Sequence, residues 1–183
     1  MPAGSLGSLS FALALILVPT AAATRHGGDF NGDGKHDLPV GVPAESFRTA
    51  TACGAVHVLF GSASGPSSNG ALFLEASHLG ASNDFLGNFG NALAIGDFDG
   101  DRIDDLAIGA PGQTVGGKEG TGAVAVLYGT KKGLKAKRIQ LWHENKKHVP
   151  DRAEDSEVFG EALAAGDFDV AEQGDRFGKA IGG

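Results

Sequence analysis

Short apolar stretches separated by glycine-rich turns run through most of the chain. In residues 54–61 and 122–129, valine and aromatic side chains alternate with alanine, leucine and one histidine, so both faces of each stretch are largely apolar. Such stretches are typical of β-strands buried between neighbouring sheets. Similar patterns predict strands at 38–42 and 106–110, at 89–96 and 159–166, and outer strands at 71–74 and 138–142.

These stretches belong to an internal repeat. Residues 29–43 match residues 97–111 without a gap, and the same offset of 68 positions carries 54–61 onto 122–129. A register that holds through the intervening loop indicates a structural repeat. Four short strands in each repeat favour a propeller blade over a sandwich, because each repeated sheet needs a neighbour to bury its face. The sequence therefore predicts an all-β fold of four-stranded blades.

Each complete repeat contains a loop with polar oxygens at alternating positions. In the second copy, Asp97, Asp99 and Asp101 are followed by Asp105. Two like charges about 4 Å apart repel by about 1 kcal/mol in water and by about 4 kcal/mol at an effective dielectric of about 20. Oxygen-rich loops of this kind suit a hard cation with many ligands. A solvated acidic turn is the alternative, and the presence of two copies disfavours it.

The spacing favours Ca²⁺ held in a loop between two strands. An EF-hand needs glycine at its sixth loop position and a bidentate glutamate at its twelfth, where this chain has Arg102 and Ile108. An EF-hand is therefore disfavoured. The expected ligands in the second loop are side-chain oxygens and the backbone carbonyl of Ile103. In the first loop they are the residues aligned with these. They are Asp97, Asp99, Asp101, Ile103 and Asp105 in the second loop and Asp29, Asn31, Asp33, Lys35 and Asp37 in the first.

A third copy starts and then loses the pattern. Residues 159–169 echo the start of the second copy, residues 170–173 replace the rest of the loop, and residues 177–183 resemble the beginning of a fourth copy. A metal site in the damaged third loop is left open. That loop keeps Asp167, Asp169 and Asp175.

Composition adds information about the start of the chain and its partners. Residues 9–18 are apolar but short for a bilayer, and small residues at 21–23 offer a cleavage site. Residues 1–23 are therefore interpreted as a helical secretory signal peptide, and no membrane span is expected in the mature chain. No Lys or Arg precedes the apolar run, and a buried helix is the alternative. The formal charge of −7 disfavours a nucleic-acid partner.

At these residues the sequence resembles the FG-GAP repeat, the blade unit of integrin α-subunit β-propellers and of bacterial integrin-like secreted proteins. Phe89-Gly90 and Phe159-Gly160 match its FG, Gly109-Ala110-Pro111 matches its GAP, and Gly41-Val42-Pro43 is a variant. The resemblance covers nearly all of the chain after the signal. It implies a seven-bladed propeller with calcium loops on one face, acting in adhesion or ligand binding.

The chain has only about two complete repeats where the resemblance implies seven. We therefore expect a partial, open β-propeller with exposed strand edges, which favour aggregation. The expected blades cover residues 24–78 and 85–148, with a truncated third blade at 156–175 and the start of another at 176–183. The first copy also lacks the Phe-Gly strand, because only residues 24–28 would precede its loop after cleavage.

The expected function is that of a secreted, calcium-binding adhesion module whose partner is an extracellular protein or glycan. The sequence has no Gly-x-Ser-x-Gly elbow, and a near-match to a phosphate-binding loop at 112–119 ends in Glu119 where Ser or Thr is required. We therefore expect that the chain is not an enzyme. The alternatives are an accessory propeller part of a secreted hydrolase acting on phospholipids or glycans, and a degenerate fragment without function.

Overall fold

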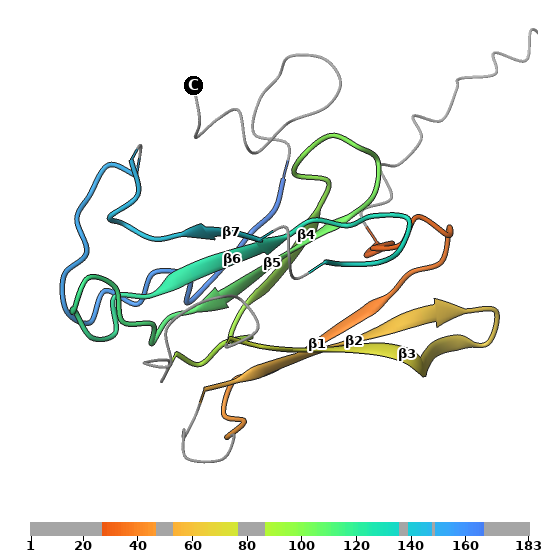
Figure 1. Cartoon of the computed structure of the whole chain (residues 1–183), viewed down its shortest axis with the longest axis horizontal. Coiled ribbons are helices and arrows are strands. Elements are labelled where there is room, and N and C mark those ends of the chain that lie inside the picture. Colours follow the sequence, from red (N-terminus) through yellow and green to blue (C-terminus); the bar gives the residue numbers. More distant parts are fainter. Residues whose placement is uncertain (1–26, 47–52, 77–86, 136–138, 148, 167–183) are drawn as a thin grey trace, which may run out of the picture.

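The computed structural model describes residues 27–46, 53–76, 87–135, 139–147 and 149–166, and these form two antiparallel sheets (Figure 1). The first sheet has the order β1 (Leu38–Val42), β2 (Ala55–Ser62) and β3 (Gly65–Glu75). The second has the order β4 (Leu93–Gly96), β5 (Asp105–Ala110), β6 (Ala123–Leu127) and β7 (Ile139–Trp142). The all-β fold with partial propeller blades is thus confirmed.

The strands of the two sheets occupy equivalent places in the repeat; we call residues 68 positions apart equivalent. β1, β2 and β3 correspond to β5, β6 and β7, and the antiparallel pairing follows the same order in both sheets. β4 pairs with β5, with Leu93 opposite Ile108. The place equivalent to β4 in the first repeat is residues 25–28, of which only 27 and 28 belong to the described residues.

The strand predicted at residues 159–166 is wrong. These residues form turns and irregular structure, joined to the second sheet by one parallel bridge between Gly122 and Phe159. The physical reason is the loss of a partner: β4 is held by β5, whereas the sequence after Asp169 no longer carries the residues of such a strand. A short apolar stretch without a neighbouring strand leaves its backbone groups unpaired.

The hydrophobic core lies between the two sheets. Alternation along the strands turns Val56 and Val58 of β2 toward Leu106 and Ile108 of β5, and all four side chains are fully buried. Burial of one such side chain contributes about 1.5–3 kcal/mol. The two repeats therefore share one core.

The glycines of the FG and GAP motifs mark the closest approach of successive repeats. A Cβ atom on Gly41 would collide with the carbonyl oxygen of Gly90, and one on Gly109 would collide with that of Gly160. Within the second repeat, the N–H of Gly90 donates a hydrogen bond to the Gly109 carbonyl (2.9 Å). Only glycine permits the close approaches at Gly41 and Gly109, so the two motifs are where blades meet.

Several sequence predictions lie outside the described residues. They are the signal peptide at 1–23, the altered third loop with Asp167, Asp169 and Asp175, and the fourth copy. Within the described ranges, no helix is long and apolar enough to cross a membrane.

Candidate metal centre

The loop that joins β4 to β5 folds around Asp97. Its Oδ1 accepts hydrogen bonds from the backbone N–H groups of Gly100 (2.8 Å) and Asp101 (3.0 Å), and its Oδ2 accepts one from Arg102 (2.8 Å). Gly100 and Arg102 have positive φ angles of 77° and 72°, which turn the chain back on itself. The loop is thereby closed around one carboxylate at its start.

Asp105 anchors the other end of this loop and is fully buried. Its Oδ2 accepts a hydrogen bond from the backbone N–H of Phe98 (2.7 Å), and its Oδ1 accepts one from Gly129 (2.7 Å). The first bond holds the start of the loop, and the second ties the loop to the end of β6. One side chain thus fixes the loop to two strands of its sheet.

The first repeat contains the same anchor. Asp37 is buried, and it accepts hydrogen bonds from the backbone N–H groups of Phe30 (2.8 Å) and Gly61 (2.8 Å). These three residues lie 68 positions before Asp105, Phe98 and Gly129, which form the same bonds in the second repeat. The offset found in the sequence therefore holds for individual hydrogen bonds.

Burial makes both anchoring carboxyls hard to ionise. Removal from water raises the pKa of Asp105 to about 7, against the hydrogen bonds from Gly129 and Phe98, and the nearby Asp99 and Asp97 raise it further. Burial likewise raises the pKa of Asp37. A bound cation would favour the ionised form of each group.

In the second loop three carboxylates converge. Asp97, Asp99 and Asp105 each place an oxygen within 4.8 Å of the others. Ca²⁺ binds oxygens at about 2.3–2.6 Å, so two of its ligands can lie up to about 5 Å apart. Asp101 is outside this group, and its Oδ1 accepts a hydrogen bond from the N–H of Ile103 (2.9 Å). The ligand role of the Ile103 carbonyl stays a prediction.

The first loop is arranged differently. Among the described residues, only the second loop brings three acidic groups together. Asp29 accepts hydrogen bonds from the N–H groups of Asp33 (3.0 Å) and Gly34 (2.8 Å), and the Asn31 side chain accepts from Asp33 (2.9 Å). The ammonium of Lys35 pairs with the Asp33 carboxylate at 3.1 Å, and the Lys35 backbone N–H and ammonium lower the pKa of that carboxyl. A cation here would compete with this internal ion pair.

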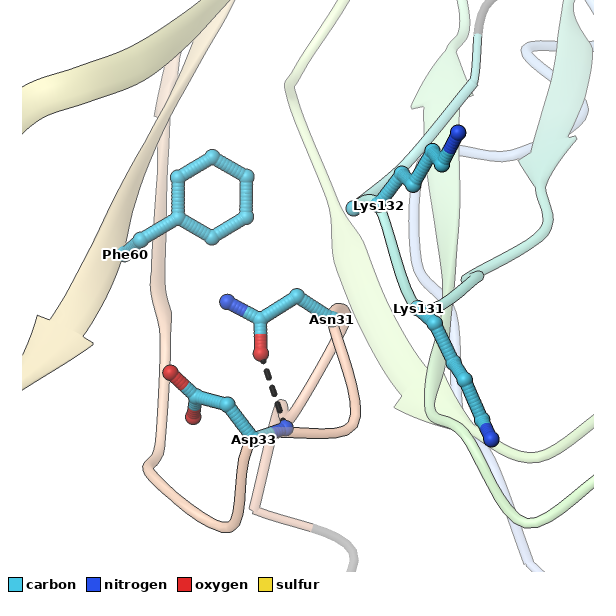
Figure 2. A pocket seen from close by; sticks show the side chains of 6 residues that line it. Asn31, Asp33, Phe60, Lys131 and Lys132 are labelled. Atoms are coloured by element: carbon cyan, nitrogen blue, oxygen red, sulfur yellow. Dashed lines mark hydrogen bonds between the residues drawn. The ribbon is translucent and has the colours of Figure 1, made fainter.

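A hollow of about 400 Å³ lies beside the first loop (Figure 2). Asn31 and Asp33 form one wall, and the side chains of Lys131 and Lys132 on the other wall point away from the Asp33 carboxylate. Phe60 closes the hollow at one end. The case against a cation in the first loop therefore depends on the Lys35–Asp33 ion pair and not on these two lysines.

Asp104 connects the two loops and was missed by sequence reasoning. Its Oδ2 accepts hydrogen bonds from the backbone N–H groups of Gly28 (2.9 Å) and Asp29 (3.0 Å) in the other repeat. Its own N–H donates to the Asp29 carbonyl (3.1 Å). The equivalent residue in the first copy is His36, so comparison of the repeats hid this contact. The one available signal was an acidic residue next to the predicted final ligand.

A known repeat family matches the part of the sequence that forms these loops. The FG-GAP repeat family matches residues 26–59 and 89–127 of the chain. These ranges include both aspartate loops and Gly41, Gly90 and Gly109, three of the four glycines where the blades meet. The chain carries FG-GAP repeats. The partial third and fourth copies lie beyond the two matched ranges.

The related proteins fall into two groups. Integrin alpha-IIb from Homo sapiens is 38% identical over 120 residues, covering 62% of this chain and 11% of the integrin. Integrin alpha-3 from Mus musculus is 34% identical over 145 residues, covering 79% of this chain and 12% of the integrin. Phosphatidylinositol-glycan-specific phospholipase D from Homo sapiens is 40% identical over 108 residues, covering 57% of this chain and 13% of the phospholipase. The chain thus spans only 11–13% of the length of these relatives.

The phospholipase relatives correct one expectation. We expected that the chain is not an enzyme, and this is contradicted by matches to phosphatidylinositol-glycan-specific phospholipase D from human, rat, mouse and cattle. The expectation was based on the missing catalytic motifs of this chain alone. A repeat shared with an enzyme does not have to carry the catalytic groups itself, because fold and activity are separable. The bacterial type suggested by the resemblance stays a prediction.

Proposed function

We propose that the chain is an exported, integrin-like binding module whose FG-GAP loops each hold one Ca²⁺ that stabilises the blades. The observation that carries this proposal is the convergence of Asp97, Asp99 and Asp105 within 4.8 Å. Oxygen ligands at this spacing suit a hard cation of about 2.3–2.6 Å ligand distance. The first loop is the weaker of the two sites, because Lys35 already neutralises Asp33.

The role proposed for the ion is structural. Asp97 holds the turn of the loop, and Asp105 is bonded to backbone groups at the loop start and at the end of β6. An ion shared by these side chains would link β4, β5 and β6 and offset the repulsion among them. It would also stabilise the ionised form of Asp105, which burial disfavours.

The proposed partner is an extracellular protein or glycan. Integrin relatives favour a binding function, and the apolar residues 9–18 followed by small residues favour export. Binding surfaces in repeat proteins are built from loops of successive repeats, so the partner would contact the loops of both blades. The net charge of −7 disfavours a nucleic acid.

Calcium binding is tested by thermal unfolding in excess Ca²⁺ and in excess chelator. At 100 times the dissociation constant, one bound ion stabilises by about 2.7 kcal/mol, which corresponds to about 5–10 °C in Tm for a chain of this size. Asp97→Asn should remove most of the difference, whereas Asp155→Asn, an exposed residue far along the chain, should keep it. Equal Tm values with and without calcium in the unaltered chain would contradict the proposal.

A second candidate is a set of blades in a secreted hydrolase. The four matches to phosphatidylinositol-glycan-specific phospholipase D favour it. It is tested by reading the coding sequence on both sides of this chain and assaying the longest product for cleavage of a phosphatidylinositol-glycan. A catalytic domain with this activity supports the hydrolase, and flanking sequence that contains only further aspartate loops opposes it.

A further inference from the structure

The interface between the two sheets shows which side chains pack together when one blade covers the next. The first sheet contributes Val56, Val58 and Leu74. The second sheet contributes the opposite side of the interface from β5, β6 and β7. Its side chains there are Leu106, Ile108, Ala125, Leu127 and Leu141.

The outer face of the first sheet carries residues equivalent to those that the second sheet turns toward the interface. Val40, His57 and Phe73 stand opposite one another across β1, β2 and β3, and Leu38 stands opposite Leu59. These five residues are equivalent to the five that the second sheet buries against the first. Here, however, Leu38, Val40 and Phe73 are 45%, 39% and 37% exposed. The outer face of the first sheet thus carries residues equivalent to a buried interface, but no sheet covers this face in the described structure.

The outer face of the second sheet carries residues equivalent to those that the first sheet turns toward the interface. Val124, Val126 and Trp142 are equivalent to Val56, Val58 and Leu74 of the first sheet, and they belong to a second apolar cluster. Phe159 and Leu163 of the third repeat cover part of this face. In the described part of that repeat, no residue takes the place of Leu106 or Ile108. An apolar pocket of about 260 Å³ remains there, lined by all five of these side chains.

We propose that these two faces bind each other between copies of the chain. The outer face of the first sheet in one copy would pack on the outer face of the second sheet in the next, with Leu38 and Val40 entering the pocket beside Trp142. This contact would repeat between chains the packing that joins the two sheets within one chain. The contact is head-to-tail, so copies would add successively until a ring closes or a filament grows.

The strand edges are compatible with this arrangement. In the described structure, β1 has no strand on the side where β4 flanks β5, and residues 159–166 form no strand and are joined to the second sheet by the bridge between Gly122 and Phe159. The two edges would meet in the proposed contact. Pro39 of β1 has no N–H to donate, so we assign the contact to side-chain packing rather than to a continuous strand ladder.

The first test measures the mass of the full chain by light scattering over a range of concentrations. We expect a concentration-dependent increase beyond the monomer and a blue shift of the fluorescence of Trp142, the single tryptophan. Val40→Asp should weaken association at least tenfold while leaving the circular dichroism spectrum unchanged, because Val40 is exposed. Leu38→Asp serves as a second variant. Val158→Asp is the matched control, since Val158 is also 39% exposed and does not line the pocket.

The second test distinguishes head-to-tail packing from unspecific adhesion. Val40→Asp alters the first face, and Leu163→Asp alters the second, so each variant alone should stay monomeric at concentrations where the unaltered chain associates. An equimolar mixture should form a one-to-one dimer and nothing larger, because it contains one intact copy of each face. A monomeric unaltered chain, association of Val40→Asp and Leu38→Asp equal to that of the unaltered chain, or a mixture that stays monomeric would each overturn the proposal.

Discussion

At the scale of single residues, Asp105 combines full burial with two short hydrogen bonds from backbone N–H groups. Those bonds favour the carboxylate, yet loss of hydration and the neighbouring Asp99 and Asp97 outweigh them and raise its pKa to about 7. Without a cation, burial keeps the Asp105 carboxyl protonated up to a pH of about 7. A bound cation would favour its ionised form. Its equivalent, Asp37, has a pKa raised by the same cause.

This raised pKa predicts an unusual pH dependence of stability in chelator. The folded chain keeps its proton on Asp105 up to pH of about 7, whereas the unfolded chain loses it near the ordinary value of 3.8. The contribution of this group to the free energy of unfolding is therefore complete below about pH 4 and is lost as the pH rises toward 7. Urea midpoints across this range should fall more steeply for the unaltered chain than for Asp105→Asn. Identical slopes would show that Asp105 does not titrate in this way.

At the scale of elements, most strands were predictable, because they lie in short apolar stretches bounded by glycine or proline. β3 differs: it was predicted at 71–74 but begins at Gly65, because the polar residues before 71 pair with the end of β2. β4 covers only Leu93–Gly96 of the strand predicted at 89–96. β1 was predicted at its observed bounds, and β2, β5 and β6 within one or two residues. The sequence could not show that residues 159–166 form no strand, since they match the residues of β4 and lack only a partner strand. The difference between the two loops also needed the structure: the sequence shows that Lys35 aligns with Ile103, but not that the Lys35 ammonium pairs with the Asp33 carboxylate.

The contact between the loops gives a prediction for Asp104. Asp104→Ala removes the acceptor for two backbone N–H groups, those of Gly28 and Asp29, and Gly28 is buried. Leaving a buried donor unpaired costs about 1–3 kcal/mol. Chemical denaturation should show a loss of this size, whereas the equivalent change in the first repeat, His36→Ala at an exposed site, should cost little. Equal effects of the two substitutions would contradict the assigned role.

At the scale of the whole molecule, the described sheets are two halves of one interface rather than separate units. Phe30 and Phe89, which precede the first strand of their respective sheets, are buried in the same core as Val56 and Ile108. The sequence predicted this stacking because both faces of its strands are apolar. It did not reveal that the two outer faces complement each other, since that follows from the observed register of the strands.

A shared core predicts cooperative unfolding of the two sheets. Ile108→Ala should cost about 2–5 kcal/mol, the usual range for such a truncation in a core. Because Ile108 packs between the sheets, hydrogen exchange should speed up for amides of β2 as well as β6. Faster exchange confined to β6 and its neighbours would indicate that the sheets unfold independently.

The cation proposed for the second loop is tested most directly by a crystal structure grown in calcium. We predict anomalous density in the loop between β4 and β5, bonded by the carboxylates of Asp97, Asp99 and Asp105 at about 2.3–2.6 Å. A well-ordered loop whose carboxylates contact only water and backbone N–H groups in saturating calcium would contradict the proposed metal site.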